Sequence, residues 1–223
     1  MKALLYKEFK LAMHPMCYLF IALFPLMILI PSYPLAIGFI YVLSCYPVLF
    51  LGANKGQQSN DLLFSTLLPV RKKDIVMARI ITVSIMQFAF ILIMTALYPL
   101  ASFIQKSIPD GVSPGLGLNA YVSVLAIALI GYSFADLIFF SVYYKHGKSI
   151  VGSTLLTILG FVFYLGIFTI AVPYIPGIEW YSNFLSGPIW KQFIVLFASL
   201  IIYFFIHLLV YKVSSKELEQ VDF

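Results

Sequence analysis

Apolar stretches of membrane-crossing length recur along almost the whole chain, and they leave few folds open to it. The hydrocarbon core of a bilayer is about 30 Å thick, so a crossing helix needs roughly 20 residues. Of the 223 residues, 62% are hydrophobic and 10% are charged, whereas soluble domains carry about 25% charged residues. The sequence therefore predicts an all-α, polytopic membrane protein with no room for a separate soluble catalytic domain. The six expected spans are 15–30, 35–52, 80–103, 118–144, 150–172 and 192–211.

Basic residues are distributed unevenly between these six expected spans. With the N-terminus in the cytoplasm, only Lys106 and Lys191 of the 14 Lys and Arg residues fall outside, so 12 fall inside. Loops rich in Lys and Arg stay on the cytoplasmic side of a membrane. The count predicts a multi-pass protein of the cell (plasma) membrane with both termini in the cytoplasm. It also accounts for the net charge of +5 without a nucleic-acid partner.

Residues 1–13 precede the first expected span. Apolar side chains share one helical face there, while Lys7 and Lys10 lie on another. This pattern predicts an N-terminal amphipathic helix in the inner membrane interface, with its lysines near anionic headgroups. The alternative is an ordinary basic flank of the first span.

The stretch 54–79 is the longest polar interruption in the chain. Its middle, 61–68, is apolar but too short to cross a bilayer. Pro69 disfavours helical geometry at Leu68, so a helix should end there. An exposed apolar surface of this kind marks a partner-binding site, although a helix resting on lipid is the alternative. The expected contact residues are Asn60, Asp61, Leu62, Leu63, Phe64, Ser65, Leu67, Leu68 and Pro69, and the expected membrane-surface basic residues are Arg71, Lys72, Lys73 and Arg79.

Residues 61–79 read DLLFSTLLPVRKKDIVMAR. They resemble the segment after the second span of type 2 ATP-binding-cassette exporter permeases. In that family an acidic residue and a leucine-rich turn precede Ser-Leu-Pro, a hydrophobic residue, Ser-Arg and Ile-Val. The positions that keep the pattern are Ser65, Leu68, Pro69, Val70, Arg71, Ile75 and Val76. The chain departs from it by one extra residue between Ser65 and Pro69, and by Arg71 where serine is usual.

This resemblance implies the permease subunit of an exporter for an amphipathic or hydrophobic substrate, such as a peptide, a lipid-like molecule or an antibiotic. It implies that 54–79 is a cytoplasmic coupling segment docked on a separate nucleotide-binding ATPase subunit, which holds ATP and magnesium. It also implies that 173–188 forms short re-entrant helices on the outer side. A second permease subunit, identical or sibling, is expected because one six-span subunit is half of such a machine.

The chain itself is expected to be neither an enzyme nor a cofactor or metal protein. Gly147-Lys148-Ser149 ends like a phosphate-binding loop, but that loop needs a glycine five positions earlier, where Val142 stands. The sequence contains no His-Glu-x-x-His, paired-cysteine or Gly-x-Ser-x-Gly motif. ATP hydrolysis is therefore expected in another chain.

Three polar residues, Gln87, Asp136 and His207, interrupt expected spans at a similar depth in the inner third of the membrane. A charge facing lipid there costs about 2.5 kcal/mol or more, so Asp136 should face protein or water. One hypothesis is that Asp136, with Gln87 or His207, lines an inward-opening cavity or gate. The alternative is a structural hydrogen bond between helices, worth about 0.6 kcal/mol.

Two other classes of membrane protein compete with the exporter permease. A stand-alone immunity or assembly protein would need no ATPase partner, and a neighbouring reading frame for a Walker-type ATPase would argue against it. A secondary transporter is disfavoured because the sequence contains no visible repeats or broken helices at mid-depth.

Overall fold

The computed structural model describes residues 2–13, 15–29, 70–106, 121–146, 150–167 and 188–220. Within these ranges every regular element is a helix. The expected second span, 35–52, lies outside the described residues. So do the expected contact residues Asn60–Pro69 and almost all of the outer segment 173–188.

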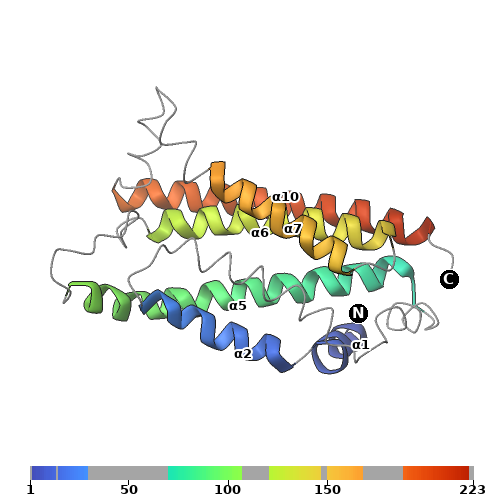
Figure 1. Cartoon of the computed structure of the whole chain (residues 1–223), viewed down its shortest axis with the longest axis horizontal. Helices are drawn as coiled ribbons and strands as arrows, with labels where there is room; N and C mark the ends of the chain where they lie inside the picture. Colours follow the sequence, from blue (N-terminus) through green and yellow to red (C-terminus); the bar gives the residue numbers. More distant parts are fainter. Residues whose placement is uncertain are drawn as a thin grey trace.

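The described helices follow the apolar stretches of the sequence (Figure 1). Their bounds are α1 Lys2–Lys7, the π-helix η1 Glu8–Ala12, α2 Pro15–Leu23, the 3₁₀-helix η2 Phe24–Leu29, α5 Lys72–Lys106, α6 Tyr121–His146, α7 Ile150–Gly166 and α10 Ile189–Gln220. The long helices extend past their expected spans, and α5 begins at Lys72, eight residues before the span expected from Ile80. Backbone hydrogen bonding does not stop where the hydrocarbon ends, so a helix can continue into the polar flank.

Three helical segments are long and apolar enough to cross a membrane, namely Lys72–Ala101, Val122–Lys145 and Trp190–Gln220. The pair Lys2–Lys10 and Pro15–Leu29, bent by 80°, would make a fourth if it counts as one span. The α7 helix is apolar but shorter than these. The described residues therefore form an all-helical protein with three or four segments suited to a membrane.

The α2, α5, α6, α7 and α10 helices lie side by side along one long axis (Figure 1). The directions of α5, α6, α7 and α10 alternate in this order, and α2 runs in the same direction as α5. The first residues of α5 and the last residues of α6 and α10 lie at the end where both chain termini are found. We call this the terminal end. The α1 helix lies there too and is viewed nearly end-on, crosswise to α5.

Close helix packing centres on α6, which lies against α10 and α7, while α5 lies against α10 and η2. Gly131 permits the α6–α7 contact, because a Cβ atom there would come within 2.8 Å of the Phe161 ring and 2.9 Å of the Tyr164 ring. Large exposed side chains, including Phe163 on α7 and Phe197 and Phe205 on α10, cover the outer faces of these helices. An apolar exterior of this kind suits contact with lipid.

Candidate functional site

Four buried polar side chains meet between α5, α6 and α10. Gln87 comes from α5, Asp136 from α6, and Tyr203 and His207 come from α10. Gln87 and Asp136 are 0% exposed, Tyr203 is 1% exposed and His207 is 8% exposed. We call these four residues the mid-bundle cluster. It joins three helices at one depth through side chains alone.

Hydrogen bonds order this cluster from one helix to the next. The Tyr203 hydroxyl donates to Oε1 of Gln87 over 2.5 Å. Nε2 of Gln87 then donates to Oδ2 of Asp136 over 2.9 Å. Because a phenol donates to the amide oxygen, the amide NH₂ group is directed at the carboxylate. Gln87 therefore bridges α10 and α6 from its position on α5.

His207 completes the cluster from the other side of the carboxylate. Its Nε2 lies 2.9 Å from Oδ2 of Asp136, and its Nδ1 lies 2.8 Å from the Tyr203 carbonyl oxygen one helical turn earlier. The Tyr203 and His207 rings stack with centroids 3.9 Å apart. Residues four apart share a helix face, so α10 delivers both side chains to the same place.

A second polar group lies nearer the terminal end. Arg79 of α5 donates through Nε to Oε2 of Glu8 over 3.2 Å and through Nη2 to Oε1 over 3.4 Å. A third guanidinium nitrogen, Nη1, lies 3.4 Å from the Tyr143 hydroxyl of α6. Lys7 Nζ lies 3.7 Å from Glu8 Oε1. We call these four residues the end cluster. Glu8 and Arg79 are only 6% and 5% exposed, so the cluster ties the N-terminal segment to α5.

A wide helical turn positions Glu8 in that cluster. The Met13 N–H donates to the Glu8 carbonyl oxygen, five residues back, over 2.9 Å, which is the hydrogen bond of a π-helix. The Phe9 carbonyl of the same turn accepts the Tyr18 hydroxyl over 2.6 Å. The N-terminal segment is therefore held by α2 as well as by α5.

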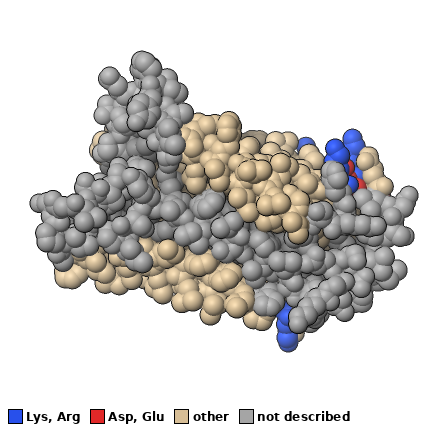
Figure 2. Space-filling view, viewed as in Figure 1, with Lys and Arg blue, Asp and Glu red and all other residues tan. Residues whose placement is uncertain are grey.

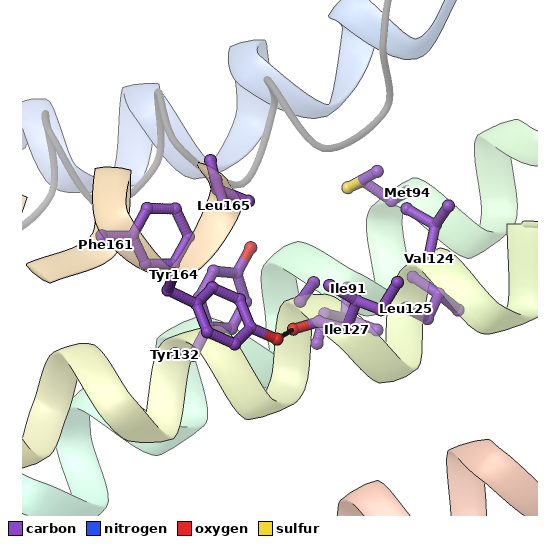
Figure 3. Close-up of a pocket in the computed structure, with 10 residues that line it drawn as sticks. Ile91, Met94, Val124, Leu125, Ile127, Tyr132, Phe161, Tyr164 and Leu165 are labelled. Carbon is purple, nitrogen blue, oxygen red and sulfur yellow. Dashed lines mark hydrogen bonds between the residues drawn. The ribbon is translucent and has the colours of Figure 1, made fainter. Parts of the chain in front are cut away.

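An apolar pocket lies between α5, α6 and α7 (Figure 3). Its lining residues follow Gln87 on α5 and precede Asp136 on α6, so the pocket lies on the side of the mid-bundle cluster away from the terminal end. Tyr164 crosses it from α7 and donates its hydroxyl to the Ile127 carbonyl of α6 over 2.7 Å. The lining residues are Ile91, Met94, Val124, Leu125, Ile127, Ala128, Tyr132, Phe161, Tyr164 and Leu165. Its aromatic and aliphatic walls suit an apolar group.

Charged side chains visible on the surface lie toward the terminal end (Figure 2). Arg71 pairs with Asp74 at 3.0 Å, and Lys73 pairs with Glu219 of α10 at 3.2 Å. The hydrogen bonds that Arg71 donates to the Asp74 carboxylate raise the pKa of the exposed Arg71 guanidinium above its ordinary value. Of the four basic residues expected at the membrane surface, Arg71 and Lys73 are exposed, Lys72 is half-buried and Arg79 is buried in the end cluster.

The three polar residues singled out within the expected spans, Gln87, Asp136 and His207, come together in the mid-bundle cluster. Their use as a cavity or gate stays a prediction. Sequence reasoning missed Tyr203, although its four-residue spacing from His207 places both on one face. It also missed Glu8 as the partner of Arg79. The available signal was that Glu8 is the only acidic residue before Asp61.

Among the described residues, no group of three or more His, Cys, Asp or Glu side chains is placed to hold a metal ion. The polar clusters are built from one carboxylate each, with neutral or cationic partners. Comparison of the chain with protein-family models, with curated proteins and with solved structures finds no match.

Proposed function

We propose that the chain is the permease subunit of an ATP-driven exporter for an amphipathic or hydrophobic substrate. In this proposal the chain crosses the cell membrane six times, with both termini and the segment 54–79 in the cytoplasm. The N-terminal helix lies in the inner interface, a separate subunit binds ATP and magnesium, and a second permease subunit completes the transporter. Support comes from the Asp61–Arg79 motif and from the gathering of basic residues at the terminal end.

One observation carries the proposal: α5 runs without a break from the second half of the Asp61–Arg79 motif to the mid-bundle cluster. The helix begins at Lys72, three residues after Pro69, and continues without a break through Gln87. That distance is roughly 22 Å at 1.5 Å per residue. A continuous helix moves as a rigid rod, so displacement of the segment before α5 would move Gln87 against Asp136 and Tyr203.

The two polar clusters are the places where a movement of α5 would act on the neighbouring elements. Arg79 is the last residue of the motif and lies before Gln87 on α5, and its ion pair with Glu8 carries the N-terminal segment along with the helix. Gln87, Asp136 and His207 then act as an inner gate, because their bonds hold α5, α6 and α10 together. Breaking these bonds opens a path between the helices toward the cytoplasm.

The pocket beyond this gate favours an apolar substrate group. Met94, Phe161 and Tyr164 contribute to its walls, and the described lining residues carry no charge. The pocket has only about 10 Å³ of free volume in this structure, so an apolar group would enter it only after the surrounding helices move apart, and a charged group would lose its hydration there. This supports a substrate with at least one hydrophobic part.

Co-purification tests the proposal. The full chain is expressed with the Walker-type ATPase encoded by a neighbouring reading frame and purified by a tag on the chain alone. We expect the ATPase to co-purify with the wild type and to fall at least about 10-fold with Leu63→Asp or Phe64→Asp, since a charge in an apolar contact costs more than about 1.4 kcal/mol.

Lys55→Asp is the matched control, because it changes charge in the same segment but outside the expected contact residues 60–69. It should retain the ATPase at the wild-type level. Absence of any ATPase with the wild-type chain would contradict the exporter function.

A further inference from the structure

The mid-bundle cluster fixes where the protons of His207 can lie. Its Nδ1 is 2.8 Å from the Tyr203 carbonyl oxygen, and a carbonyl oxygen can only accept a hydrogen bond. Nδ1 therefore carries a hydrogen. The other ring nitrogen, Nε2, is left to interact with the carboxylate of Asp136.

A proton is also required between His207 and Asp136. Nε2 lies 2.9 Å from Oδ2, and at that distance the lone pair of a neutral Nε2 and the negative charge of a carboxylate would repel each other. The proton is bound either to Nε2, giving an imidazolium beside a carboxylate, or to Oδ2, giving a neutral imidazole beside a carboxylic acid. In both arrangements the pair is electrically neutral and shares one proton.

The neighbouring side chains do not change this charge balance. Gln87 from α5 is neutral, and the titratable side chains one helical turn from the pair are phenols: Tyr132 of α6, and Tyr203 and Tyr211 of α10. On α7 the only titratable side chain is Tyr164, whose hydroxyl is bonded to Ile127.

The nearest full charges on α5 and the N-terminal segment, Arg79 and Glu8, pair with each other. Arg79 lies about 12 Å from Gln87 along the helix axis. Because a net charge buried in a low-dielectric interior is costly, the pair of Asp136 and His207 is stable only with one shared proton.

We propose that Asp136 and His207 form a buried proton-binding site that holds one proton at neutral pH. Gln87 and Tyr203 are its positioning residues. The site is made from two helices, α6 and α10, so a movement that separates them destroys it. Proton binding and the arrangement of the bundle are therefore thermodynamically linked. This inference does not depend on the exporter function, because it requires neither an ATPase nor a transported substrate.

Counting the protons of the pair tests the proposal. The full chain carrying His14→Gln and His146→Gln has His207 as its sole histidine. In lipid nanodiscs at pH 7, nitrogen NMR of labelled histidine reports the protonation of both ring nitrogens. Infrared spectra of labelled aspartate report protonated carboxyl groups. An aspartate in water has a pKa near 3.9, so a protonated carboxyl at pH 7 marks a residue kept from water.

Two results support the site. Either the imidazole is doubly protonated and every aspartate is ionised, or the imidazole is neutral and one protonated carboxyl is present. Two results overturn it: a neutral imidazole with all aspartates ionised, or an imidazolium together with a protonated carboxyl. These spectra are recorded with Asp136 and His207 both in place, so the test does not need a folded Asp136 variant.

Two substitutions in the same background assign the signals. Asp136→Asn should abolish the imidazolium or the carboxyl band, whichever is present. Tyr203→Phe keeps the ring but removes the donor to Gln87, and it should shift the Nε2 resonance, while Tyr6→Phe at an exposed position of α1 leaves it in place. A spectrum of Asp136→Asn identical to the parent would overturn the site. An unshifted Tyr203→Phe resonance would overturn the positioning role of Tyr203.

Discussion

The mid-bundle cluster and the end cluster join the same two helices but distribute their charges in opposite ways. In the mid-bundle cluster α5 provides the neutral amide of Gln87 and α6 provides the acid, Asp136. In the end cluster α5 provides the cation, Arg79, and α6 provides the neutral hydroxyl of Tyr143. In each case the charged partner comes from a third element.

Because of this difference, α10 and the N-terminal segment are attached to different helices. The α10 helix is held to α6 by the contact of Asp136 with His207, whereas the N-terminal segment is held to α5 by the ion pair of Arg79 and Glu8. The hydrogen bonds of the two clusters between α5 and α6 each join a neutral group to an ionisable one: Gln87 to Asp136, and Arg79 to Tyr143. A motion of α5 should therefore carry the N-terminal segment with it and leave α10 with α6.

Removing Asp136 should have the largest effect on this arrangement. Asp136→Leu leaves His207 and Gln87 without their shared acceptor, and loss of one buried charge partner costs about 3–5 kcal/mol. Unfolding of the purified protein in detergent, followed by circular dichroism, measures the loss. Ser133→Ala is the control, since this hydroxyl bonds only to the carbonyl of Ile130 in its own helix and its loss should cost about 0.5–1.5 kcal/mol.

Equal losses for Asp136→Leu and Ser133→Ala would show that the mid-bundle cluster does not hold the bundle together. The gate hypothesis has its own readout. If Asp136→Asn and Asp136→Leu both assemble and transport as the wild type does, Asp136 does not act in a gate.

Breaking the end cluster should have the next largest effect. Glu8→Leu and Arg79→Leu should each cost about 3 kcal/mol, near the lower limit for a broken buried pair, because a polar neighbour remains in each case. Lys7 still lies beside Glu8, and the Tyr143 hydroxyl still lies beside Arg79. The double variant should cost less than the two together, with a coupling energy of about 1–3 kcal/mol. Denaturant unfolding of the four proteins gives this cycle.

The exposed pair of Lys73 and Glu219 provides the matched cycle, since both residues are charged and also join α5 to another helix. Its coupling energy should stay below about 1 kcal/mol. A coupling in the buried pair no larger than in the exposed pair would remove the distinction between an end cluster and an ordinary surface contact.

Removal of the Tyr203 or Tyr143 hydroxyl should give the smallest losses of stability. Comparing the two losses shows which cluster contributes more. Tyr203→Phe leaves Oε1 of Gln87 buried without its donor, at a cost of about 1–3 kcal/mol. Tyr143→Phe removes a long contact of 3.4 Å and should cost about 0.5–1 kcal/mol. The same unfolding measurement compares them, and a larger loss for Tyr143→Phe would reverse the proposed order.

The depth of the polar residues in the bundle could be predicted from the sequence. The direction in which each side chain points from its helix could not. Counting along the apolar stretches placed Gln87, Asp136 and His207 at one level. The α6 helix is apolar on all sides, so its periodicity does not indicate which face carries Asp136 toward a partner. The contacts of Asp136 with Gln87 and His207 arise only once the helices are packed.

The end cluster was harder to predict because Glu8 and Arg79 are 71 residues apart. No local pattern links them, and a basic residue at the edge of a span ordinarily indicates a membrane surface. The only signal for this pair in the sequence was complementary charge, because a single acidic residue stands among the N-terminal lysines. Burial of Arg79 follows from the path of the N-terminal segment, which is a property of the assembled fold.

The π-helical turn from Glu8 to Ala12 makes the number of residues in this segment as important as their identity. Deleting one residue there would let the chain wind as an ordinary α-helix, in which each residue turns by about 100°. Glu8 and everything before it would rotate by that angle away from Arg79. The number of residues in the turn therefore sets the orientation of Glu8 toward Arg79. Insertions and deletions between Glu8 and Met13 should be tolerated far less than substitutions at its exposed positions.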